Sequence, residues 1–117
     1  MLGDRSGHAT AYALDNLQTR GTMFVGPGDI VYEGMVVGES SRPGDMVVNA
    51  VREKEKTNIR THSHDEGAKL APPVVHTLET AIEFIADDEL VEVTPSAIRI
   101  RKRILAEQDR RRAYKRG

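Results

Sequence analysis

TLETAIEFIADDELVEVTPSAIRIRKRI, at residues 77–104, carries the strongest structural signals in this chain. Apolar residues recur at helical spacing in its first third, and Thr77 stands where a helix N-cap would. These features predict a helix over residues 78–86, whose apolar face would comprise Leu78, Ala81, Ile82 and Ile85. The three acids at 87–89 follow at the negative end of the helix dipole, so we interpret them as a solvated terminator of the helix.

The rest of this stretch predicts a β-hairpin. Ile98 and Ile100 alternate with arginine at the period of a strand, and Pro95-Ser96 suits a tight turn between 90–94 and 97–103. The register would oppose Glu89 to Lys102, Val91 to Ile100, Glu92 to Arg99 and Val93 to Ile98. The alternative is a helix over 96–105 that starts at the proline, but the alternation favours the strand.

Charge is divided unevenly along the chain. Residues 98–117 hold nine Lys/Arg against two acids, whereas residues 1–97 hold eight basic and sixteen acidic residues. This asymmetry indicates an anionic partner for the C-terminal end. The row Arg99, Arg101, Lys102 and Arg103 could follow a nucleic acid backbone, because alternate strand residues are spaced about as far apart as successive phosphates. Residue type alone favours the alternative, a solvated or cross-strand-paired face.

Length and composition indicate one domain with an aliphatic core. The 117 residues are 38% hydrophobic and 30% charged, with only five aromatic residues. The chain has no cysteine, which excludes disulfides and thiolate metal sites and fits a reducing compartment, so we predict a cytoplasmic protein. No apolar run is long enough to span a bilayer, and residues 1–10 lack the pattern of a signal peptide, so no membrane partner is expected.

Catalytic and metal-binding motifs are missing from the sequence. There is no phosphate loop of the G-x-x-x-x-G-K-[ST] type, no cysteine nucleophile and no supportable Ser-His-Asp arrangement. We therefore predict no catalytic residue, no cofactor site and no small-molecule substrate. His62 and His64 could ligate a metal with His76, but their segment lacks a strand signal, so we interpret them as solvent-exposed and predict no metal site.

A short amphipathic helix is predicted over residues 8–18. Its apolar residues recur at helical spacing and comprise Ala9, Ala13, Leu14 and Leu17. Gly21 stands where a left-handed C-cap would follow. Helices of this length are marginal in water, so the apolar stripe needs another surface to pack on.

Strand signals follow this helix. The first is short, at 22–25, and the second, at 30–38, has apolar residues on both faces, which predicts a largely buried strand. A β-branched run resumes at 46–51. Because Arg42-Pro43-Gly44-Asp45 suits a type II turn, we expect the last two segments to form a hairpin.

Residues 52–69 break this pattern. Five of the eighteen residues are basic and four are acidic, and only Ile59 is strongly apolar. Loops of this length are uncommon in compact domains unless they are functional or mobile. The basic, hydroxyl and amide side chains suit phosphates, sugars and bases of structured RNA, but the nearly balanced charge also suits a plain surface loop. The residues alone leave both interpretations open.

Several sequence blocks resemble one known family. They are VYEGMVVGE at 31–39, DMVVN at 45–49, KTNIR at 56–60, DE at 65–66, PP at 72–73 and TLETAIEFIADDELVEVTPSAIRIRKRIL at 77–105. These blocks are ordered and nearly continuous from about residue 10 to 112. In them the chain resembles the C-terminal domain of the BipA (TypA) family of ribosome-associated translational GTPases.

The resemblance implies an α+β fold in two parts. Residues 1–29 would be the last helix and strand of the ferredoxin-like domain that the family shares with elongation factor G. Residues 30–117 would be the family-specific domain, small and mostly antiparallel, with one packed helix and a basic C-terminal tail. The severed helix would expose Ala13, Leu14 and Leu17, or cover them by self-association of the chain.

The resemblance also implies a function. The GTPase domain, with its GTP and Mg²⁺, would lie N-terminal to Met1, so this chain would not be an enzyme. In the family this domain docks on the ribosome, and its long loop reaches large-subunit rRNA and the A-site tRNA acceptor end. The expected RNA contacts are Arg52, Lys54, Lys56, Thr57, Asn58, Arg60, Thr61, His62, Ser63 and His64. Secondary contacts would be Arg99, Arg101, Lys102 and Arg103. The alternative is a protein interaction module that acts through acidic residues 87–92 and basic residues 99–112.

Overall fold

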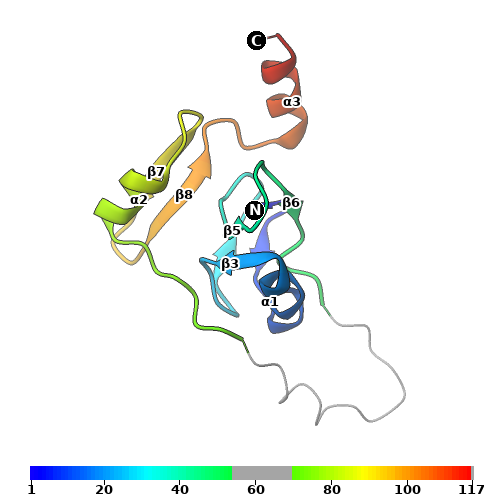
Figure 1. Cartoon of the computed structure of the whole chain (residues 1–117), viewed down its shortest axis with the longest axis vertical. Coiled ribbons are helices and arrows are strands. Elements are labelled where there is room, and N and C mark those ends of the chain that lie inside the picture. Colours follow the sequence, from blue (N-terminus) through cyan, green and yellow to red (C-terminus); the bar gives the residue numbers. More distant parts are fainter. Residues whose placement is uncertain (54–69, 117) are drawn as a thin grey trace.

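The computed structural model describes residues 1–53 and 70–116 of the chain. Within them, three α-helices accompany eight short strands that pair two by two, so the predicted α+β class is confirmed. Three of the four pairs are antiparallel and one is parallel. In Figure 1 the β7–β8 hairpin and α2 lie together on one side, and α3 projects at one end of the long axis. No helix in these described ranges combines the length and apolarity needed to cross a membrane.

The C-terminal hairpin forms as the sequence predicts. β7 (Glu89–Val93) pairs antiparallel with β8 (Ile98–Lys102), and the four predicted cross-strand partners are all observed. Thr94 closes the turn, because its backbone N–H donates to Ala97 O at 2.9 Å and its hydroxyl to the same oxygen at 3.1 Å. The alternative helix over 96–105 is therefore wrong.

The predicted helix is present as α2 (Leu78–Phe84), but its buried face differs from the prediction. Thr77 caps it, accepting from Thr80 N at 3.2 Å, as the sequence predicts. Ala81 is fully buried against the hairpin, with Phe84 and Ile85 beside it. Leu78 and Ile82, predicted on the same face, are 46% and 56% exposed. The small side chain of Ala81 lets the helix lie close to the hairpin, and that contact turns the two larger side chains outward.

Strand pairing in the first half differs from the predicted hairpin between 30–38 and 46–51. β1 (Leu2–Gly3) pairs in parallel with β6 (Val47–Val48). The antiparallel pairs are β2 (Gly7–His8) with β4 (Ile30–Val31), and β3 (Gly21–Met23) with β5 (Gly38–Ser40). The Gly44 φ of +96° fits the predicted type II turn. However, the strands on either side of this turn do not pair with each other. β5 pairs with residues 21–23 and β6 with residues 2–3, so the turn joins two different strand pairs.

The first helix is α1 (Ala11–Leu17), capped by Thr10 and extended by a 3₁₀ turn, η1 (Gln18–Arg20). The prediction that its stripe is exposed is wrong, because Ala13, Leu14 and Leu17 are 3%, 2% and 9% exposed. This stripe packs on residues from both sides of position 29, which share one core. The buried members of this first core are Met1, Ala9, Leu14, Leu17, Met23, Val25, Val31, Met35, Val37, Val48 and Ala50. Self-association through the stripe therefore lacks the exposed surface it requires.

Gly21 does not cap α1 as predicted. Its φ of 166° is extended backbone, and it begins β3 instead. A Cβ at this position would lie 2.1 Å from Glu39 O in the paired strand β5. Glycine is therefore required here by the close approach of two backbones.

Residues 35–37 connect the first core with a second one under the hairpin. Met35 and Val37 are buried in the first core, whereas Val36 belongs to the second core with Leu2, Ala81 and Ile100. The Val36 backbone N–H donates to Ile100 O at 2.7 Å, which adds this segment to the free edge of β8. Burial on both faces is thus confirmed at residues 35–37, but the single strand predicted over 30–38 is wrong, because β4 ends at Val31, residues 33–34 form a turn, and Met35 and Val36 make only isolated bridges.

Candidate nucleic-acid interface

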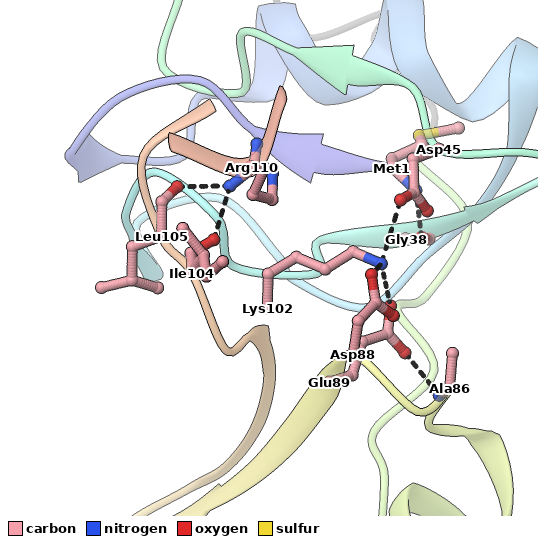
Figure 2. A network of polar contacts seen from close by, with 10 residues as sticks. All are labelled: Met1, Gly38, Asp45, Ala86, Asp88, Glu89, Lys102, Ile104, Leu105 and Arg110. Atoms are coloured by element: carbon pink, nitrogen blue, oxygen red, sulfur yellow. Dashed lines mark hydrogen bonds and ion pairs between the residues drawn. The ribbon is translucent and has the colours of Figure 1, made fainter. Parts of the chain in front are cut away.

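Lys102, predicted as an RNA contact, lies inside the protein. Its side chain is 2% exposed, and its Nζ is 2.8 Å from Asp88, 2.9 Å from Asp45 and 3.1 Å from Glu89. Figure 2 shows the three carboxylates converging on this ammonium from the 42–45 turn and from the start of β7. Lys102 lies on the same face of β8 as Ile98 and Ile100, because side chains alternate along a strand. This face points inward, toward the second core. Its assignment as an RNA contact is therefore wrong.

Of the three acids predicted to be solvated, Asp87 is exposed, but Asp88 and Glu89 pair with Lys102, so the prediction is wrong for these two. Glu89 is 7% exposed, and its Oε1 accepts from Ala86 N at 2.8 Å, which closes the turn after α2. Burial alone lowers the pKa of Lys102, but hydrogen bonds to Asp88, Asp45 and Glu89 raise this pKa by more, so the net pKa lies above its ordinary value. The cluster thus holds a charged lysine and joins three chain segments.

The opposite face of β8 retains part of the predicted basic row. Arg99 is a quarter exposed and lies 3.6 Å from Glu92 Oε1, which also accepts from the Tyr32 hydroxyl at 2.9 Å. Burial and this hydrogen bond raise the pKa of Tyr32 to about 12. Arg101 is half-buried, and Arg103 is exposed beyond the end of the strand. The face is therefore partly paired across the strands. Of its three arginines, Arg103 is the most exposed.

The C-terminal basic segment is a docked helix, α3 (Glu107–Arg116). Glu33 Oε2 accepts from Glu107 N at 3.0 Å and so caps its first turn. Arg110 is 4% exposed, and its Nη1 donates to Ile104 O at 3.1 Å and to Leu105 O (Figure 2). Arg111 and Arg112 remain exposed, and Arg111 pairs with Glu107 at 2.7 Å. These outward arginines extend the basic surface beyond β8.

Of the predicted loop contacts, only Arg52 falls within the described residues, and Lys54 to His64 lie outside them. Arg52 is exposed, with its guanidinium 5.9 Å from the centre of the Tyr12 ring. The segments on either side of 54–69 are both fastened to α1. Thr10 Oγ1 donates to Arg52 O at 2.5 Å, and Ala71 N donates to Gln18 Oε1 at 2.9 Å. We call these two flanking segments the stems of 52–69, and both are hydrogen-bonded to the ends of the same helix.

His76, the third histidine of the metal alternative, lies among aromatic rings. Its ring centre is 4.4 Å from that of Phe24 and 5.5 Å from that of Phe84. Its Nδ1 lies 3.2 Å from Thr80 Oγ1. Over residues 1–53 and 70–116, no group of three potential ligands could hold a metal ion. His62 and His64 are outside these ranges.

Sequence reasoning missed two participants in this region. Asp45 reaches Lys102 from 57 positions away in the chain, and Tyr32 reaches Glu92 from 60 positions away. No local pattern marks either contact. Spacing in the sequence predicts only the cross-strand pairs of the hairpin, and those predictions are confirmed.

The chain is similar to known proteins over most of its length. A sequence model of the TypA/BipA C-terminal domain matches residues 1–107. The chain is 53% identical over 113 residues to the large ribosomal subunit assembly factor BipA of Escherichia coli K12. The proteins of the same name from Haemophilus influenzae and Buchnera aphidicola are 48% and 46% identical to it.

These alignments cover 97%, 97% and 95% of this chain, but only 19%, 18% and 18% of the relatives. The chain thus spans about a fifth of the length of the relatives it matches. The similarity reaches from the first β-strand to the start of α3 and includes both cores and the Lys102 cluster. The chain therefore belongs to the TypA/BipA C-terminal domain family.

Proposed function

We propose that this chain is the region of a large ribosomal subunit assembly factor that binds the subunit through RNA. The observation that carries this proposal is the alignment of nearly the whole chain, at up to 53% identity, with proteins that bear this name. GTP and Mg²⁺ would bind in another domain of the longer protein, and this chain would contribute docking and not catalysis. The protein would act in the cytoplasm.

Segment 52–69 would make the primary contacts, with large-subunit rRNA and the A-site tRNA acceptor end. Its basic side chains suit phosphates, and its hydroxyl and amide groups suit sugars and bases. Support comes from the stems, because Arg52 is exposed and both stems are fastened to the well-packed helix α1. The primary set remains Arg52, Lys54, Lys56, Thr57, Asn58, Arg60, Thr61, His62, Ser63 and His64.

The secondary contact set that we propose retains only part of the predicted basic row. Lys102 and Arg110 are excluded by burial, and Arg99 is held by Glu92. Arg101 and Arg103 remain, with Arg112 as an exposed addition from α3. The alternative of an interaction module acting through residues 87–92 loses three of its four acidic groups, because Asp88, Glu89 and Glu92 pair within the chain and only Asp87 is left exposed.

Co-sedimentation of the chain with purified large ribosomal subunits across a salt series tests this proposal. If about four basic groups engage phosphates, the logarithm of the binding constant should fall with the logarithm of salt with a slope of roughly −3 to −4. Replacement of Lys54, Lys56 and Arg60 by alanine should weaken binding and reduce this slope by roughly 2 to 3.

A matched control removes the same charge elsewhere. Arg5, Arg20 and Arg42 are exposed and lie outside both proposed contact sets, so their triple alanine variant should bind nearly as the parent does. Salt-independent association, or equal loss of affinity in the two triple variants, would contradict the proposal.

A further inference from the structure

The outward side of α2 exposes large apolar side chains. Leu78 and Ile82 are 46% and 56% exposed, and Val74 and Val75, just before the helix, are 45% and 81% exposed. Elsewhere in the described chain, Ile30 and Val93 are the only large apolar side chains exposed to this degree, and Val47 is 36% exposed. A concentration of this kind is typical of an interaction surface.

The same side of the helix is acidic. Glu79 and Glu83 are exposed, and the sequence contains no Lys or Arg anywhere from residue 70 to residue 98. Neither glutamate forms an ion pair with any residue that the structure describes. The negative charge here is therefore uncompensated, unlike that of Asp88 and Glu89.

These side chains form two adjacent stripes. Leu78 and Ile82 are four residues apart, so they lie on the same side of α2 about one turn apart. The same holds for Glu79 and Glu83. Because each glutamate follows an apolar residue by one position, the acidic stripe runs beside the apolar stripe around the helix. We call the surface made by these four residues the α2 outer face.

We propose that the α2 outer face docks a basic amphipathic segment of another protein, one with an apolar stripe flanked by Lys or Arg. The apolar stripe of the partner would cover Leu78 and Ile82, and its cations would meet Glu79 and Glu83. This contact goes beyond RNA binding, because it uses groups that the proposed RNA contacts leave free. It gives the chain one surface for protein and another for nucleic acid.

Charge decides against the other occupants. RNA and an anionic membrane surface are both repelled by two uncompensated glutamates. A second copy of the chain, placed face to face with antiparallel helices, would bring the glutamates of one copy beside those of the other, and with parallel helices the face would still offer them no cation. A basic protein segment is the occupant for which both stripes are favourable.

Fluorescence anisotropy with a labelled helical peptide of leucine and lysine tests this assignment. Replacement of Ile82 by glutamine should weaken binding about tenfold, as expected for a central apolar contact. Replacement of Glu79 and Glu83 by glutamine should weaken binding and reduce its dependence on salt. The control is Ile30→Gln, because Ile30 is 57% exposed on β4 and almost equals Ile82 in exposure. This control should bind as the parent does.

Each contrary outcome has a definite meaning. Equal binding by Ile82→Gln and the parent, equal loss in Ile30→Gln, or equal binding of a leucine–glutamate peptide would overturn the proposal. A self-association of the parent that Ile82→Gln abolishes, seen by sedimentation velocity, would assign the face to a second copy instead. Because no ribosome is used, failure here is separate from failure of the RNA proposal, and Ile82→Gln should keep the parent's salt slope on large subunits.

Discussion

Lys102 ties the hairpin to the 42–45 turn through buried ion pairs. It is a charged side chain in a core position of β8, and three carboxylates from two distant segments keep it charged. Removing one partner of a buried ionic cluster leaves uncompensated charge, so it costs more than the intact cluster contributes. The three carboxylates would then repel one another with no cation between them.

Lys102→Met should therefore lower the free energy of unfolding by about 3 kcal/mol. The control Arg103→Met removes an exposed cation from the next position and should change this free energy by less than about 0.5 kcal/mol. Urea unfolding followed by circular dichroism measures both. Because the folded pKa of Lys102 is raised above 10.5, its stabilising contribution should be complete below pH 10.5 and should be lost progressively as the pH rises from there to the folded pKa. Equal stability of the two variants would show that the cluster is not needed.

Tyr32 provides a pH-dependent prediction. Its pKa is raised to about 12 by burial and by the hydrogen bond to Glu92, so the folded state favours the neutral phenol. This contribution to stability is complete below pH 10.0, the ordinary pKa of tyrosine, and is lost as the pH rises toward 12. Glu92→Gln should shift the ionisation of Tyr32 to lower pH, whereas Glu39→Gln, an exposed carboxylate on β5, should not.

An alkaline titration of tyrosine ultraviolet absorbance measures this shift. Replacement of Tyr12 and Tyr114 by phenylalanine leaves Tyr32 as the single tyrosine in the sequence. The same ionisation curve with and without Glu92 would contradict the assigned hydrogen bond.

At the scale of elements, the short strands depend on backbones that approach closely. β3 and β5 are three residues each, and a Cβ on Gly21 would lie 2.1 Å from Glu39 O and 2.9 Å from Ser40 Cα. Backbone atoms cannot rotate aside as a flexible side chain can. A methyl group at this position must therefore separate the two strands.

Gly21→Ala should lower the free energy of unfolding by about 1–3 kcal/mol, as overpacking does. Gly26→Ala is the matched control, because its Cβ would meet Pro73 Cγ at 3.6 Å and Asp29 Oδ2 at 3.9 Å, both ordinary contacts, and it should cost less than about 0.5 kcal/mol. Thermal unfolding of the two variants distinguishes these outcomes. Unchanged stability of Gly21→Ala would mean that β3 and β5 do not pair as described.

At the scale of the whole molecule, two cores share residues 35–37. Because Val36 packs in the second core and its neighbours pack in the first, neither core can lose this segment without disturbing the other. The hydrogen bond from Val36 N to Ile100 O adds a backbone link at the same point. We therefore expect the two cores to unfold as one unit.

Urea transitions followed by the NMR methyl signals of Leu14, in the first core, and Ile100, in the second, should coincide. Val36→Ala should lower both midpoints equally, with a loss of about 2 kcal/mol. The control Val47→Ala, at a position 36% exposed, should cost clearly less. Separate transitions, or a shift of the Ile100 midpoint alone, would show that the cores are independent.

The parts of this fold that were predictable are those in which neighbours in sequence are neighbours in space. The hairpin register followed from alternation and one turn, and the cap of α2 followed from Thr77, because these contacts span few residues. The pairing of β1 with β6 joins residues about 45 positions apart, and no local pattern selects one partner among several apolar segments. A separation of 57 positions likewise concealed the pairing of Asp45 with Lys102, so the sequence pattern suggested a surface cation where the structure has a buried one.

The anchoring of the 52–69 stems on α1 has a mechanical consequence. One stem is held by Thr10, the N-cap of this helix, and the other by Gln18, its C-cap. A pull on the segment between the stems would therefore act on both ends of this helix, whose Leu14 and Leu17 are buried in the first core. Tension on this segment would therefore act first on the interior of the first core, and residues 35–37 would transmit it to the second core.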